Sequence, residues 1–133
     1  MWSSEMISKV VNSLMVSKSK YRPVAPDIMV ENEYDLGKYI PSTKVISTPG
    51  HTSSSIILVI GNEAAFVGDT LFNIMPWNVF PLFANDIREL LESWQRLIDA
   101  SCRTYFPCHG RPIPLRKLKI SYEKRIKRIN EEL

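Results

Sequence analysis

Three polar residues stand where the sequence predicts that β-strands end, and their side chains are of types that bind metal ions. His51 follows the apolar run Lys44–Thr48, His109 follows the short run Arg103–Pro107, and Asp69 comes directly after another apolar run. Imidazole nitrogens and carboxylate oxygens are normal zinc ligands, and a catalytic zinc typically takes three protein ligands and a water. The set therefore predicts a metal site, provided that the fold brings the three strand ends together.

Each of these residues also has a plainer interpretation. A histidine beside a glycine is more often a turn residue or a hydrogen-bonded partner than a ligand, and both histidines of the chain have a neighbouring glycine. Asp69, which precedes a threonine, suits an Asx-turn or a helix cap equally well. The order and context of the three residues together favour the metal-binding interpretation over these alternatives.

The segments around the three residues resemble three consecutive motifs of one enzyme family. They are Thr48–Ser53 (TPGHTS), Val67–Phe72 (VGDTLF) and Pro107–Gly110 (PCHG). These look like motifs of the metallo-beta-lactamase superfamily, particularly its glyoxalase-like hydrolases, and the likeness covers nearly the whole chain. The segment Pro26–Leu36 is similar to the one that leads into the first motif of that family.

The resemblance implies a role for each residue. His51 would be a ligand of a first zinc ion, Asp69 the catalytic carboxylate that bridges two zinc ions, and His109 a ligand of the second. In the family, a water activated between the metals attacks an ester, thioester, amide or phosphoester bond. The resemblance therefore implies a zinc-dependent hydrolase with a small-molecule substrate, whose identity the sequence leaves open.

One part of the family pattern is absent from the sequence. The opening motif, His-x-His-x-Asp-His, supplies two ligands to each zinc, and the chain has no histidine besides His51 and His109 from which to build it. We therefore expect the chain alone to bind zinc weakly or not at all, and to be inactive unless residues outside it complete the site. The alternative is a non-catalytic, self-associating remnant of the fold that has lost the metal site. The expected partner is a second copy of the chain or a missing N-terminal half, because an uncovered sheet face or edge invites pairing.

The elements that would position these residues form a mixed α/β pattern within a single domain, residues 1–133. Apolar periodicity predicts helices over Glu5–Ser17, Ile87–Ile98 and Leu115–Ile129, and strands over Lys44–Thr48, Ser55–Ile60, Ala64–Val67 and Arg103–Pro107. A short extended run is predicted over Asp27–Glu31 and an irregular loop over Met75–Phe83. The resemblance implies the C-terminal portion of a four-layer αββα metallo-beta-lactamase sandwich, with a mainly antiparallel sheet and two or three helices.

The composition limits which binding partners and which cellular compartment are expected. A net charge of +3 is too small to indicate a polyanionic partner, and the basic C-terminal helix lacks interleaved aromatic residues, so nucleic acid is not expected. The two cysteines, Cys102 and Cys108, are too few for a disulfide framework. The longest apolar run lies within Ile56–Ile60, far short of the roughly 20 residues of a membrane helix. A cytoplasmic protein without a membrane partner is therefore expected.

Other candidate residues carry less weight. Ser53, Ser54 and Ser55 lack the Gly-x-Ser-x-Gly pattern of a serine hydrolase. Cys108 beside His109 could suggest a thiol nucleophile with its base, but adjacent residues of an extended chain point in opposite directions, so a cysteine that is buried or supports a ligand is expected. Three aromatic residues of the predicted loop could line a substrate pocket or pack in the core. They are Trp77, Phe80 and Phe83.

Overall fold

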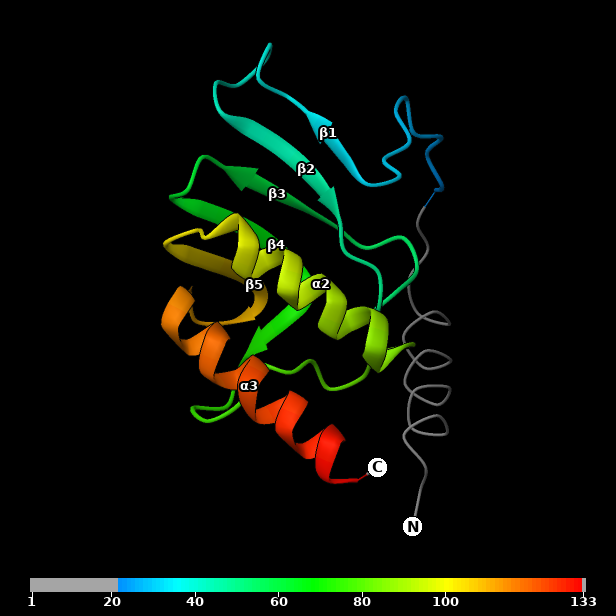
Figure 1. Cartoon of the computed structure of the whole chain (residues 1–133). Helices are drawn as coiled ribbons and strands as arrows, with labels where there is room; N and C mark the ends of the chain where they lie inside the picture. The colour runs from blue at the N-terminus through cyan, green and yellow to red at the C-terminus, as the bar shows by residue number, and fades with distance from the viewer. Residues whose placement is uncertain (1–21, 133) are drawn as a thin grey trace.

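A computed structural model describes residues 22–132, which contain one six-stranded sheet and two helices (Figure 1). The elements are β1 (Glu33–Asp35), β2 (Thr43–Ser47), β3 (Ile56–Ile60), β4 (Ala64–Asn73), α2 (Ile87–Ala100), β5 (Thr104–Gly110), β6 (Ile113–Pro114) and α3 (Leu115–Glu131). The predicted helix Glu5–Ser17 lies outside the described residues. The predicted fold class, mixed α/β with a mainly antiparallel sheet, is confirmed.

The strands lie in the sheet in the order in which they occur in the sequence, β1-β2-β3-β4-β5-β6. Every neighbouring pair is antiparallel except β4 and β5, which run parallel. A parallel pair needs a crossover connection, and α2 supplies it between β4 and β5. The β4–α2–β5 unit therefore places the ends of two parallel strands next to each other at one edge of the sheet.

The core lies between the sheet and the two helices, which cover the same face of the sheet (Figure 1). Alternate strand residues point into it, as the two-residue period of a strand requires. Examples on neighbouring strands are Val59, Ala65 and Tyr105, which are aligned in register and are buried. From the helices, Leu90, Leu97 and Leu118 complete this core and are fully buried.

The opposite face of the sheet carries a row of apolar side chains that crosses four strands in register. The row runs through Val45, Leu58, Phe66 and Phe106. The rings of Phe66 and Phe106 stack at 5.3 Å, yet Phe66 is still 48% exposed. We call these four residues the apolar row. The apolar row lies on the face of the sheet that the two described helices do not cover.

Several strand boundaries differ from the prediction, and the strand predicted to end at Pro107 continues to Gly110, through His109. The extended run predicted over Asp27–Glu31 is wrong, because this segment contains bends, and strand β1 begins two residues later, at Glu33. Pairing decides its position: a turn closed by a hydrogen bond from Leu36 N to Thr43 O aligns β1 with β2. The strand predicted to end at Val67 instead continues to Asn73, through the segment that contains Asp69.

The two described helices match the predicted ones closely. Helix α2 begins after Asp86, whose side chain accepts hydrogen bonds from the backbone N–H groups of Arg88 and Glu89 at 2.8 and 3.0 Å, as an N-cap does. Helix α3 begins after Pro114, which cannot donate to a preceding strand or turn. Neither helix has the length and apolar character needed to cross a membrane, and the search for such helices covered the described residues only.

Candidate metal centre

The structure brings together the three residues that the sequence singled out, with Asp69 between the two histidines. His51 Nε2 lies 3.7 Å from Asp69 Oδ2, and His109 Nε2 lies 3.3 Å from Asp69 Oδ1. Each carboxylate oxygen thus faces a different imidazole. The arrangement is two histidine–carboxylate pairs that share one aspartate, rather than one three-membered ring of ligands.

Asp69 lies in the middle of strand β4 and not at its end, which corrects the expectation drawn from the sequence. The pairing of β4 with β5 is regular up to Phe66, shifts at Gly68 and shifts again before Phe72. Gly68 has a φ of 52°, a left-handed value that lets the strand bulge without breaking. The bulge re-aims the following residue, and it explains how a carboxylate inside a strand reaches both histidines.

The His51 loop follows β2 and is fastened to the start of α2. Backbone hydrogen bonds run from Asp86 N to Gly50 O at 3.0 Å and from Asn85 N to His51 O at 3.3 Å. The hydroxyl of Ser93 donates to Pro49 O at 2.7 Å. Gly50 has a φ of 129°, and a Cβ added there would lie 2.3 Å from Leu90 N, so only glycine allows the loop to approach the helix this closely.

The imidazole of His51 is held in one tautomer by a backbone carbonyl. Its Nδ1 lies 2.9 Å from Phe83 O, and because a carbonyl only accepts, Nδ1 must be the donor. In a neutral ring, Nε2 then carries the lone pair, which is directed towards the carboxylate of Asp69. Nε2 of His51 and the carboxylate of Asp69 are then two acceptors that repel each other unless a cation lies between them. Histidines that bind metals typically donate their other ring N–H to a fixed acceptor, as His51 does here.

His109 is the more accessible histidine of the two. It is the penultimate residue of β5 and its side chain is 53% exposed, against 8% for His51. Its ring lies 4.7 Å from that of Phe72, its partner on β4 in the parallel pairing. Solvent or a ligand can therefore approach the site from the His109 side.

One oxygen of Asp69 lacks a hydrogen-bond partner. Asp69 Oδ1 is buried and, among the described residues, accepts no hydrogen bond, although it faces His109 Nε2. A buried carboxylate oxygen without a partner is costly, and a bound cation would remove that cost. The donor types and the fixed tautomer of His51 fit zinc. The number of donors does not, because no group of three His, Cys, Asp or Glu side chains within residues 22–132 is placed to hold one metal ion.

Several contacts that support this site were not predicted from the sequence. Trp94 Nε1 donates to Thr70 O at 2.9 Å, and the hydroxyls of Thr48 and Thr70 lie 3.2 Å apart in the core. The first contact ties β4 beside Asp69 to α2, and the second joins β4 to the segment that precedes His51. Apolar periodicity did predict the helix from Ile87, but nothing in the sequence indicates that the helix holds the His51 loop.

The three aromatic residues of the predicted loop have different surroundings. Phe83 belongs to the site, since its carbonyl holds His51 and its ring lies 4.8 Å from the imidazole. Phe80 packs against Trp94 in the core at 5.7 Å. Trp77 is 72% exposed and lies at neither place.

Of the two expectations for Cys108, burial or support of a ligand, burial is wrong. Cys108 is exposed, while the other cysteine of the chain, Cys102, is fully buried. Burial raises the pKa of the Cys102 thiol, with the charge of Lys44 opposing the shift. Cys102 therefore behaves as a core residue.

Comparisons with known proteins identify the family. The model of the metallo-beta-lactamase superfamily matches residues 3–109, well over half of the chain. This chain belongs to the metallo-beta-lactamase superfamily. No curated protein sequence gives a significant match.

Solved structures of the same fold extend the comparison. An archaeal metallo-beta-lactamase superfamily protein from Sulfolobus tokodaii is 21% identical, with a TM-score of 0.63 over 92% of this chain and 50% of its own. A metallo-beta-lactamase from Erythrobacter litoralis is 16% identical, with a TM-score of 0.61 over 86% of this chain and 53% of its own. A metallo-beta-lactamase family protein from Thermus thermophilus is 18% identical, with a TM-score of 0.56 over 97% of this chain and 47% of its own. The chain thus has the fold of about half of each of these proteins.

Proposed function

We propose that this chain contributes His51, Asp69 and His109 to a dinuclear zinc site of a hydrolase. In this proposal His51 binds one zinc ion, His109 binds the other, and Asp69 bridges them. Membership of the superfamily suggests a hydrolase. The observation that carries the proposal is that the two oxygens of Asp69 face different histidines at 3.7 and 3.3 Å.

The residues of the chain orient the donors and limit their access. The Phe83 carbonyl keeps the proton of His51 on Nδ1, so that Nε2 remains free to bind a cation. The bulge at Gly68 aims the carboxylate, and the exposure of His109 leaves one side of the site open to substrate. Bound zinc would supply an activated water for attack on an ester, thioester, amide or phosphoester bond, the reaction class that the superfamily suggests.

The number of ligands implies a contribution from elsewhere. Each histidine–carboxylate pair gives a metal two protein ligands, whereas a catalytic zinc usually takes three. The chain has no third histidine. We infer that the remaining ligands belong to another segment of the fold, either on a longer polypeptide or on a partner chain, and that these 133 residues alone bind zinc weakly.

The test is a calorimetric zinc titration of the chain, followed by assays with a generic thioester and a generic phosphodiester. We expect weak binding that is lost in His109→Ala and in Asp69→Asn. Asp99→Asn is the matched control, because it changes an exposed carboxylate of α2 that accepts a hydrogen bond from Gln95. Turnover should be absent with the chain alone and should arise when an N-terminal half with the His-x-His-x-Asp-His motif is added in trans.

Two results would contradict this proposal. Tight binding of one zinc ion, with turnover by the chain alone that His109→Ala abolishes, would make the chain a self-sufficient enzyme. Failure of zinc binding with and without the added half would favour the second candidate, a non-catalytic remnant that associates through its sheet. That candidate is supported by the missing third ligand and by the apolar row.

A further inference from the structure

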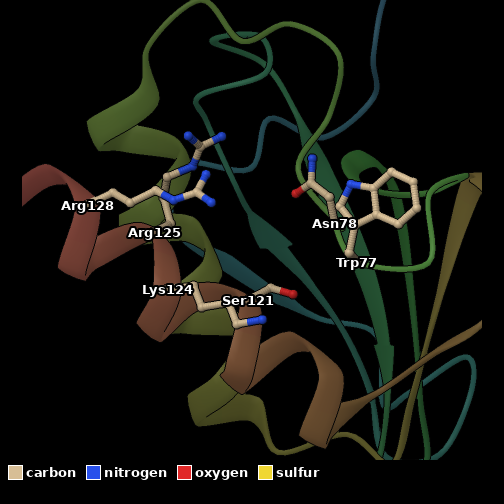
Figure 2. Close-up of a pocket in the computed structure, with 6 residues that line it drawn as sticks. All are labelled: Trp77, Asn78, Ser121, Lys124, Arg125 and Arg128. Carbon is tan, nitrogen blue, oxygen red and sulfur yellow. The ribbon is translucent and has the colours of Figure 1, made fainter.

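A hollow separate from the candidate metal centre lies between α3 and the loop that follows β4. Figure 2 shows the six residues around it, with the basic side chains on α3 facing the loop. They are Trp77, Asn78, Ser121, Lys124, Arg125 and Arg128. None of the six carries a negative charge, and the metal-centre residues are not among them.

The three cations of this hollow have no carboxylate partner among the described residues. Within residues 22–132, lysine or arginine forms an ion pair with a carboxylate at two places, Lys44 with Glu33 and Lys127 with Glu131. Arg125 and Arg128 lie close enough for the charge of Arg128 to lower the pKa of Arg125, and Lys124 lines the same hollow. Like charges this close repel each other, and an anion between them would remove the repulsion.

The position of Arg125 is fixed by packing. Its guanidinium lies 3.9 Å from the centre of the Phe80 ring, which itself packs on Trp94. Burial lowers the pKa of Arg125 and the neighbouring charge of Arg128 lowers it further, while Glu132 acts in the opposite direction. Even with a lowered pKa, the guanidinium of Arg125 stays protonated at neutral pH. Its partly desolvated positive charge is therefore available to bind an anion.

The loop side of the hollow offers further donors and a flat surface. Asn78 Oδ1 accepts from Phe80 N at 2.9 Å, which leaves the amide N–H groups of Asn78 available as donors. Ser121 adds a hydroxyl from α3. The indole of Trp77 is 72% exposed and also lines a neighbouring, mainly apolar hollow beside Pro76 and Ile120.

We propose that this hollow binds the phosphate group of a small ligand whose planar ring stacks on Trp77, as a mononucleotide could. Several charged donors that line one hollow suit a phosphate, which accepts several hydrogen bonds at once. An exposed indole is a surface on which a base can stack. The inference is independent of the proposed zinc site, because it uses none of the same residues.

The experiment follows the indole N–H signal of Trp77 by NMR while the full chain is titrated with adenosine monophosphate, inorganic phosphate and adenosine. The signal is assigned with Trp77→Phe. We expect adenosine monophosphate to shift this signal and to bind more tightly than either of the other two probes. In the Lys124→Gln/Arg128→Gln double variant the affinity should fall at least about tenfold, since each lost contact is a charged hydrogen bond.

The matched control is the Lys119→Gln/Lys127→Gln double variant, which removes the same net charge from the same helix at positions outside the hollow. It should change the affinity less than about twofold. An equal loss in the control would show that only bulk charge matters and would overturn the proposal. So would equal binding of adenosine and adenosine monophosphate, or the absence of any shift at millimolar concentration. A far higher affinity for a short single-stranded oligonucleotide would replace the proposed ligand with a nucleic-acid strand.

Discussion

His51 takes its orientation from backbone atoms rather than from other side chains. The carbonyl of Phe83 fixes its ring, and its own loop is bonded through the backbone of Gly50 and His51 to the residues that precede α2. Substitutions that keep the backbone path should therefore be tolerated around this histidine. A substitution that moves the path should displace the imidazole even when no ligand is changed.

Gly50 is the position at which this can be tested. We expect Gly50→Ala to lower the free energy of unfolding by roughly 3 kcal/mol or more, because it adds a clash with the backbone of α2 at Leu90 to an unfavourable φ. Urea unfolding followed by circular dichroism measures the loss. The control is Gly61→Ala, where φ is also positive but no atom lies within 4 Å of the added Cβ. It should cost only about 1 kcal/mol, and losses of equal size would show that the contact with Leu90 has no effect.

At the scale of elements, α2 is the part of the molecule that holds the site in shape. The guanidinium of Arg96 donates to the carbonyls of Ser47 and Asn32, on β2 and just before β1. Near its end, Leu97 O accepts a hydrogen bond of 2.7 Å from the hydroxyl of Tyr105 on β5. One helix thus fastens strands from both sides of the site.

The contact between α2 and β5 predicts how stability depends on pH. Burial raises the pKa of Tyr105 to about 12 from 10.0, the charge of Cys102 adds to the shift, and the hydrogen bond from Cys102 N opposes it. Because the folded protein holds this proton more tightly than the unfolded chain, its contribution is complete below about pH 10 and is lost as the pH rises towards 12. We expect the free energy of unfolding to fall steeply over this range.

Tyr105→Phe tests the prediction in two ways. At neutral pH it should destabilise the protein by about 1 to 3 kcal/mol, because the buried carbonyl of Leu97 and the N–H of Cys102 lose their partner. Above pH 10 it should flatten the dependence, since the titrating group is gone. Urea unfolding at several pH values measures both effects, with Tyr39→Phe, at an exposed site, as the control. An alkaline fall that is unchanged in Tyr105→Phe would assign the effect to another group.

The elements differ in how well the sequence predicts them. Both described helices and four of the six strands follow from apolar periodicity, which is a local property. The position of Asp69 inside β4 did not follow from it, because Gly68 suggests the end of a strand and only the distant partner β5 lets the strand continue. The role of Phe83 could not be predicted either, because its backbone carbonyl fixes His51 and every residue type has such a carbonyl. The three motif residues were found because their chemistry lies in their side chains.

At the scale of the whole molecule, the sheet face that the two described helices leave uncovered carries the apolar row. The apolar row crosses β2, β3, β4 and β5, and Ile56, which lies on the same strand as Leu58, is 54% exposed. Burying apolar surface is worth about 25 cal/mol per Å². A few hundred Å² of this face would therefore favour association.

We expect the chain to form at least a dimer through this face. Light scattering across a dilution series should show a mass that falls on dilution, and Phe66→Lys should shift the equilibrium towards the monomer. Leu82→Lys is the control, because Leu82 is also exposed, at 76%, but lies in the loop before α2 and outside the apolar row. A monomer at high micromolar concentration would show that this face is already covered in solution.

The parallel pairing of β4 with β5 also sets the order in which the site can assemble during folding. Strands β2, β3 and β4 are joined by short connections and pair with their sequence neighbours, so their contacts close small loops. The β4–β5 contact closes a loop that includes all of α2, and such non-local contacts form slowly. We therefore expect the contact of His109 with Asp69 to form late in folding. A mutation that weakens α2 should delay this contact more than the pairing of β2, β3 and β4.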